Sequence, residues 1–165
     1  MLQAEQLIAG CRGGKPLTNG PDGEAADLRT AISRAYYATF LTAVAFLNDL
    51  GYSVTDSSKC HGAVKTALIQ SNEVKLERVA SDYGTLGTYR RKADYDLDNK
   101  DVENLSRAEE MLKLCQSVWA TIGSVGKRTQ SDLNYRALLV ASIDAWRERD
   151  GVKEIQKTTT QQGQP

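Results

Sequence analysis

Arg90 is the residue whose type and position are best suited to chemistry in this chain. It opens the charged segment 90–96, in which three cations precede an acid, a tyrosine and a second acid. At helical spacing Arg90 falls on an apolar stripe, whereas Arg91 and Lys92 do not. A guanidinium fork matches phosphate oxygens, so an inward arginine suits a phosphate from outside the chain. An ion pair with Asp94 is the structural alternative, although this order of charges is the less favourable one.

Tyr95 follows Arg90 by five residues, so the two side chains flank one rim of a helix rather than one stripe. A tyrosine at this rim can donate a hydrogen bond to a phosphate or stack on a base. Ordinary packing is the alternative, and the residue type alone favours it. We treat Arg90 and Tyr95 as candidate catalytic residues, and Arg91, Lys92 and Asp94 as candidate residues for binding RNA or a nucleotide.

An earlier segment, 33–40, places an arginine and two adjacent tyrosines inside an otherwise apolar helix. Tyr36 fits the core stripe and is expected to pack with its hydroxyl satisfied at the edge of the core. Arg34 and Tyr37 lie one turn apart and off that stripe. They are candidates for contact with a ligand, and a subunit contact remains the alternative.

His61 is the only histidine of the chain. A lone histidine is usually a capping or surface residue, but its unperturbed pKa also allows acid–base work near neutrality. We therefore treat His61 as a third candidate catalytic residue. No pair among Cys11, Cys60 and Cys115 has the spacing of zinc ligands, so we predict no metal site and no cofactor.

Apolar residues recur at helical spacing along most of the chain, and no segment indicates a strand. The predicted helices cover 2–9, 24–50, 59–70, 73–97, 101–122 and 132–149. Asp101 is the expected N-cap of the fifth helix, and Gly123 is expected to end it. Gly84 and Gly87 predict a bend or break in the fourth helix. Short connections between such helices predict an all-α, antiparallel bundle of five to six helices.

The chain divides into three parts by composition: a short helix with a Gly/Pro-rich loop over 1–23, the bundle over 24–150, and a polar, disordered tail over 151–165. The helix 24–50 carries a second apolar stripe. That stripe consists of Tyr37, Phe40, Leu41 and Val44. A helix that is apolar on two sides is buried on two sides, so we predict a subunit interface there.

Composition narrows the classes of function. The 165 residues carry 21 basic and 21 acidic side chains, which argues against a broad electrostatic grip on nucleic acid but allows a local basic site. No apolar run reaches 18 residues, so no membrane span is expected. Three unpatterned cysteines and the lack of a signal-like start predict reduced thiols and a cytoplasmic location.

Together these motifs resemble the HEPN superfamily, the higher eukaryote and prokaryote nucleotide-binding domains. The likeness rests on the segment 33–40, on His61-Gly62 and on the segment 90–96, and it covers roughly 24–122. It is closest to the branch with a serine-arginine-alanine-tyrosine-tyrosine-alanine helix and an arginine-x-x-alanine-aspartate-tyrosine helix. The resemblance implies an antiparallel bundle that forms homodimers in prokaryotic toxin–antitoxin or antiviral defence systems.

The resemblance also implies an activity, because many HEPN proteins are metal-independent endoribonucleases. Their signature is an arginine, then four to six intervening residues, then a histidine, placed on the dimer cleft. Here Arg90 matches the arginine, but Tyr95 stands where the histidine is expected. Three functions stay open: an RNA-cleaving toxin in which Arg90 stabilises phosphorane charge, a catalytically silent partner of a nucleotidyltransferase or other effector that binds RNA or a nucleotide, and a purely structural adaptor.

Overall fold

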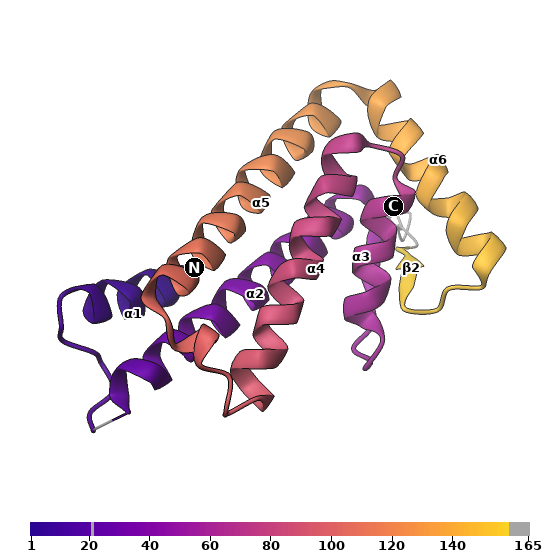
Figure 1. Cartoon of the computed structure of the whole chain (residues 1–165). Coiled ribbons are helices and arrows are strands. Elements are labelled where there is room, and N and C mark those ends of the chain that lie inside the picture. Colours follow the sequence, from indigo (N-terminus) through magenta and orange to yellow (C-terminus); the bar gives the residue numbers. More distant parts are fainter. Residues whose placement is uncertain (21, 159–165) are drawn as a thin grey trace, which may run out of the picture.

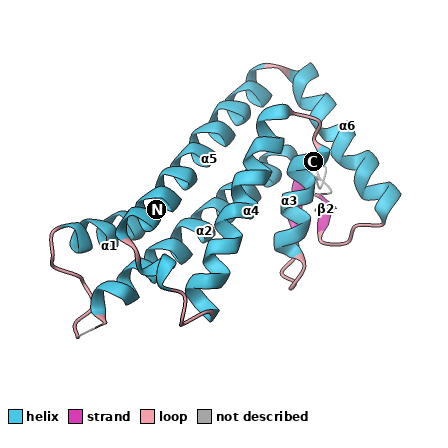
Figure 2. Ribbon diagram, viewed as in Figure 1, coloured by secondary structure: helices cyan, strands magenta, loops and turns pink. Residues whose placement is uncertain are grey.

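A long central helix, α2 (Gly23–Leu50), contacts α1, α3, α4, α5 and the strand β1. The structure is a computed structural model that describes residues 1–20 and 22–158, shown in Figure 1 and Figure 2. Its other elements are α1 (Leu2–Arg12), β1 (Tyr52–Val54), α3 (Cys60–Gln70), α4 (Val74–Tyr95), the 3₁₀ helix η1 (Lys100–Glu103), α5 (Leu105–Ser131), α6 (Leu133–Asp150) and β2 (Ile155–Lys157). The predicted all-α bundle is confirmed, and α4 runs antiparallel to α3 and α5 (Figure 1).

The core has two parts along α2. One lies between the C-terminal half of α2, α3, the first turns of α4, and α6. The other lies between α1, the N-terminal half of α2, the second half of α4 and the start of α5. Phe40 packs against both parts, which places it at their junction. Tyr36 and the candidate residues Tyr37 and His61 lie at this junction, where the rings of Tyr36, Tyr37 and Phe40 all neighbour that of His61.

The fifth helix is longer than predicted and starts later. Asn104, not Asp101, caps α5, because its Oδ1 accepts hydrogen bonds from the backbone of Ser106 and Arg107. The helix continues through Gly123 because its buried stripe continues beyond that residue to Val125 and Thr129. Burial of that stripe outweighs the low helix propensity of glycine. Two residues at helical spacing with the apolar stripes of their predicted helices lie outside the core: Trp119 is 58% exposed, and Leu97 lies beyond the end of α4 and is 73% exposed.

The predicted absence of strands is also wrong. Residues 52–54 and 155–157 form a small antiparallel sheet in which Val54 pairs with Ile155. Ile155 is fully buried, so this part of the predicted disordered tail over 151–165 packs against the bundle. Ile155 is a single apolar residue among polar neighbours, so it forms no alternating pattern that could predict a strand. Residues 159–165 of that tail lie outside the described residues.

The helix α4 is continuous where a bend or break was expected. Gly87 lies inside it, and a Cβ at this position would be 3.3 Å from the ring of Tyr36 on α2. The Tyr36 ring is stacked on that of Tyr83, with centroids 5.3 Å apart and planes 9° from parallel. The glycine therefore lets an aromatic ring of α2 lie directly against the α4 backbone.

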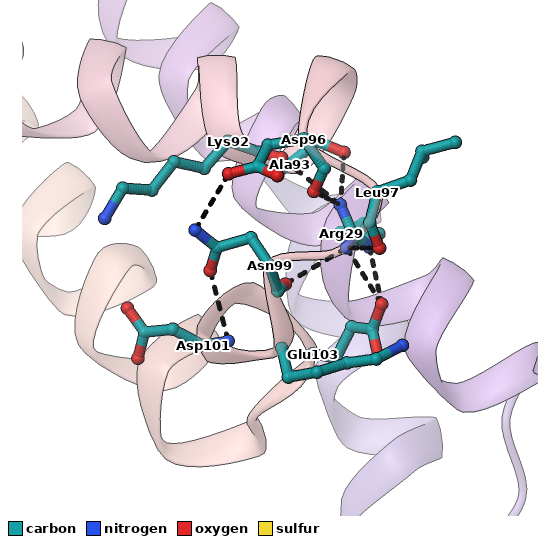
Figure 3. A network of polar contacts seen from close by, with 9 residues as sticks. Arg29, Lys92, Ala93, Asp96, Leu97, Asn99, Asp101 and Glu103 are labelled. Atoms are coloured by element: carbon teal, nitrogen blue, oxygen red, sulfur yellow. Dashed lines mark hydrogen bonds and ion pairs between the residues drawn. The ribbon is translucent and has the colours of Figure 1, made fainter.

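The C-terminal end of α4 is held by Arg29 of α2, as Figure 3 shows. Its Nη1 donates to the backbone carbonyls of Lys92, Ala93 and Asp96, and its Nη2 to those of Leu97 and Asn99. Its Nε donates to Glu103 at 2.9 Å. The last carbonyls of a helix lack partners within the helix, so one guanidinium here satisfies the end of α4 and the following turn.

We predict that Arg29→Met lowers the free energy of unfolding by about 3 kcal/mol, because five carbonyls and Oε1 of Glu103 lose their Arg29 donor. Arg12→Met is the matched control. The Arg12 side chain is 65% exposed and, among the residues that the structure describes, pairs only with Glu109, so its loss is expected to cost less than about 1 kcal/mol. Urea unfolding of both variants measures the difference, and equal losses would contradict the role given to Arg29.

A pair of glycine substitutions tests the contact between α2 and α4. Gly123→Ala is expected to stabilise the fold by up to about 1 kcal/mol, because nothing lies near its Cβ position and alanine favours helix. Gly87→Ala is expected to destabilise the fold by roughly 1 kcal/mol, because the stacked Tyr36 ring cannot move away from the added methyl group. Equal stabilisation of both variants in thermal unfolding would show that the ring does yield.

Candidate functional site

The guanidinium of Arg90 lies between side chains of two helices. Its Nη2 donates to the hydroxyl of Tyr37 on α2 at 2.8 Å and to that of Tyr95 at 3.3 Å. Its Cζ lies 5.3 Å from the Tyr37 ring centroid and 5.1 Å from that of Tyr95, which are cation–π distances. The stripe analysis placed Arg90 facing inward, and its side chain is 21% exposed. The arginine is thus partly buried and fixed in orientation.

Asp94 forms the internal ion pair that the sequence left open. Its Oδ2 lies 2.6 Å from Arg90 Nε, but the N–H of this nitrogen is not aligned for a hydrogen bond. We regard the contact as an ion pair because the distance is short and the charges are opposite. Burial lowers the pKa of Arg90, but Asp94 and the hydroxyls of Tyr37 and Tyr95 outweigh it and raise the pKa above its ordinary value. The cation is therefore permanent.

The Arg90 guanidinium retains one nitrogen for another partner. Its Nε faces Asp94 and its Nη2 is bound to two tyrosine hydroxyls. Among the residues that the structure describes, none accepts a hydrogen bond from Nη1. Nη1 is also not one of the buried, unsatisfied atoms of the described chain. It is consequently a positioned donor at the surface, with two hydrogens for an anion.

A second group of polar atoms lies behind Arg90. The hydroxyl of Tyr36 is 3.0 Å from His61 Nδ1 and 3.0 Å from the hydroxyl of Tyr83, and Nδ1 is 3.2 Å from the Tyr83 hydroxyl. Both tyrosines are buried. Arg90 Cζ lies 6.0 Å from the Tyr36 ring, which joins the two groups. The structure thus brings His61 and Arg90, which are far apart in sequence, to the same site.

The two tyrosine hydroxyls and Nδ1 of His61 contact one another, and the number of hydrogens they share determines the tautomer of His61. Each of the two hydroxyl hydrogens needs an acceptor, and either possible order of bonds ends at His61 Nδ1. If Nδ1 carried a proton, one buried hydroxyl would have no acceptor among the described residues, which is costly. His61 therefore accepts at Nδ1 and, when neutral, carries its proton on Nε2. Burial, and next the charge of Arg90, lower the pKa of His61 below its ordinary value.

This geometry weakens the expected role of His61 as a proton shuttle. A neutral imidazole with its proton on Nε2 can donate a hydrogen bond there but cannot accept a proton there. The pKa values of Tyr36 and Tyr83 are both raised, chiefly by burial, so neither hydroxyl supplies a ready base near neutrality. The hydrogen bonds of Tyr36, Tyr83 and His61 thus hold these groups in fixed directions.

The remaining predicted residues lie away from this site. Arg91 is exposed and donates to Thr88 at 3.4 Å. Lys92 Nζ lies 4.9 Å from the ring of Tyr89, on another side of α4, and Figure 3 shows its side chain extending away from Arg29. Arg34 is exposed on α2, and no contact joins it to Arg90 among the described residues. The site is thus narrower than the sequence predicted.

An open cavity of about 360 Å³ adjoins the site. Its lining is Tyr37, Phe40, Leu41, Val44, Val54, Thr55, Asp56, Cys60 and His61. The rings of Phe40 and His61 are 4.1 Å apart at their centroids. All four residues of the predicted second apolar stripe of α2 therefore line the cavity. The sequence gave no signal for Asp56, and it marked Tyr83 only as apolar because periodicity does not place hydroxyls.

No family model, curated protein or solved structure matches this chain. The HEPN resemblance therefore stays a prediction that rests on the residues quoted above. None of the helices within the described residues is long and apolar enough to cross a membrane. Within the same residues, no group of three or more histidine, cysteine or acidic side chains could hold a metal ion.

His61 gives a direct test of this geometry because it is the only imidazole of the chain. We predict that its ¹⁵N NMR signals show the Nε2–H tautomer, with a pKa below the ordinary value. Arg90→Met should raise that pKa by removing a positive charge, while the control Arg91→Met should leave it unchanged. An Nδ1–H tautomer would contradict the hydrogen count, and an unaltered pKa in Arg90→Met would contradict the proximity of the two residues.

The same pKa predicts how stability depends on pH. The folded-state pKa of His61 lies below its unfolded value near 6.5, so the unfolded chain binds the proton first. Stability should therefore fall as the pH drops through the unfolded value toward the folded one. Urea unfolding at about pH 7.5 and at about pH 5, on either side of the ordinary histidine pKa of ~6.5, measures this dependence. The free energy of unfolding should fall less for His61→Gln than for the natural chain.

Proposed function

We propose that the protein is an HEPN-type RNA- or nucleotide-binding protein of a prokaryotic toxin–antitoxin or defence system. A phosphate of the ligand binds at Arg90. One observation carries this proposal: Nη1 of a partly buried guanidinium is oriented by the hydroxyls of Tyr37 and Tyr95 and has no partner among the described residues. A fixed guanidinium loses little entropy when it binds an anion, and its fork suits phosphate.

Binding without cleavage is better supported than an endoribonuclease. Tyr95 occupies the position of the expected histidine, and it lacks an imidazole that could serve as acid or base near neutrality. His61 accepts hydrogen bonds at Nδ1, so it is available as a donor at Nε2 rather than as a base. The proposed role is accordingly a binding module, whose partner is a nucleotidyltransferase or another effector.

The proposal includes a second copy of the chain. Leu41 is 63% exposed and Tyr95 72% exposed, and each lies beside the Arg90 site or its cavity. Large exposed apolar side chains that adjoin one site favour an interface. We propose a homodimer whose cleft contains the Arg90 site. Sedimentation velocity measures the oligomeric state, and a strict monomer at micromolar concentration would remove the dimer from the proposal.

The binding test compares two neighbouring arginines of the same helix. Arg90→Met and Arg91→Met remove the same charge, but only Arg90 belongs to the site. We predict that Arg90→Met weakens binding of a fluorescently labelled single-stranded RNA at least about tenfold, since a charge-assisted hydrogen bond contributes about 1.5–3 kcal/mol. Arg91→Met should weaken it by less than about threefold through the loss of general charge.

The same assay, run with transfer RNA in EDTA, separates the candidate functions. RNA that is bound but stays intact supports the binding module. Cleavage that is lost in Arg90→Met would replace it with the endoribonuclease. If the natural chain binds no RNA or nucleotide, or if both variants weaken binding equally, the proposal is overturned and the adaptor function takes its place. Circular dichroism of each variant shows that the fold is retained.

A further inference from the structure

The cavity next to the Arg90 site has the position of a second subsite. Tyr37 and His61 belong to both: Tyr37 accepts a hydrogen bond from Arg90 and also lines the cavity, and His61 lines it from the side of α3. A ligand group bound at Arg90 would therefore have the cavity as its immediate neighbour. The volume of about 360 Å³ falls in the range of small-molecule sites.

The walls of the cavity suit a flat ring. Phe40 and Tyr37 supply aromatic surface, and Val44 and Val54 supply aliphatic surface. Every nucleobase presents a π face that packs on such side chains, and this stacking is worth more than an aliphatic contact of the same size. The apolar walls alone would accept any base.

The polar atoms of the lining are few, and they have distinct roles. The hydroxyl of Thr55 already donates to the carbonyl of Glu154 at 3.2 Å. The Asp56 carboxylate is exposed and takes part in no hydrogen bond or ion pair with the described residues. His61 supplies a donor at Nε2, because its Nδ1 accepts from one of the buried tyrosine hydroxyls. The side chains of the cavity thus include a donor at His61 Nε2 and a carboxylate acceptor at Asp56.

We propose that this cavity binds a nucleobase of the ligand whose phosphate lies at Arg90, and that it prefers guanine. A carboxylate can accept two parallel hydrogen bonds, and only guanine presents two adjacent donors, at N1 and N2, for Asp56. Its O6 and N7 acceptors suit the Nε2–H of His61. Adenine, cytosine and uracil each lack that pair of donors. This inference rests on the proposed function and names its ligand class.

The test uses ligands that differ by single groups. Isothermal titration calorimetry of the natural chain measures the affinity for guanosine, inosine and adenosine 5′-monophosphates and for inorganic phosphate. Inosine monophosphate differs from the guanosine nucleotide only in lacking the 2-amino group. We expect the guanosine nucleotide to bind at least about tenfold more tightly than the other two, which is the discrimination expected of a bidentate pair.

The matched variants are Asp56→Asn and Asp98→Asn. Both residues are exposed and lose the same charge, but Asp98 lies outside the cavity. Asp56→Asn is expected to abolish the preference for guanosine over inosine monophosphate, because an amide cannot accept at both positions. Asp98→Asn should keep it. Equal affinities for the three nucleotides, or a preference that survives Asp56→Asn, would overturn the inference.

The failure of this inference differs from the failure of the proposed function. If the three nucleotides bind equally and Arg90→Met abolishes their binding, the phosphate site stands and the guanine subsite is wrong. If no nucleotide and no phosphate binds, and RNA does not bind either, the proposed function itself is wrong. A guanosine preference that Arg90→Met leaves intact would separate the cavity from the phosphate site and overturn the joint ligand.

Discussion

The contact of Tyr36 with Gly87 sets how α2 and α4 meet, and the candidate site follows from that contact. A ring lies 3.3 Å from where a side chain of residue 87 would begin, so the helices approach closely only because a glycine is there. This approach brings Tyr37 of α2 within 2.8 Å of Arg90 on α4. It also stacks Tyr36 on Tyr83, which places both hydroxyls at His61 Nδ1. Packing therefore positions the polar groups.

Two arginines of the bundle differ in how many of their nitrogens have partners within the described chain. Arg29 donates from all three of its nitrogens to carbonyls and a carboxylate of its own chain, and its side chain is only 11% exposed. It satisfies the end of α4 and has nothing left for a ligand. Arg90 uses Nη2 and faces Asp94 with Nε, but its Nη1 has no partner among the described residues. This remaining donor is the reason for our proposal that Arg90 binds a ligand.

The sequence predicted the helices and the inward position of Arg90 because both depend on a local period. The sequence did not predict the features that depend on contacts between residues far apart along the chain. Asn104 caps α5 in place of the predicted Asp101, because Asp101 lies in the 3₁₀ helix η1, whose packing before α5 has no local period. Ile155 is an isolated apolar residue that is buried only by pairing with β1. The pairing of His61 with two tyrosine hydroxyls joins residues from three helices, which no local pattern reports.

We propose that Arg90 binds a phosphate from outside the chain, and a crystal structure of the protein with guanosine 5′-monophosphate is the decisive test. We expect a phosphate oxygen within hydrogen-bonding distance of Arg90 Nη1, with Tyr37, Asp94 and Tyr95 still in place. A nucleotide bound elsewhere, with Arg90 contacting only those three side chains, would contradict it.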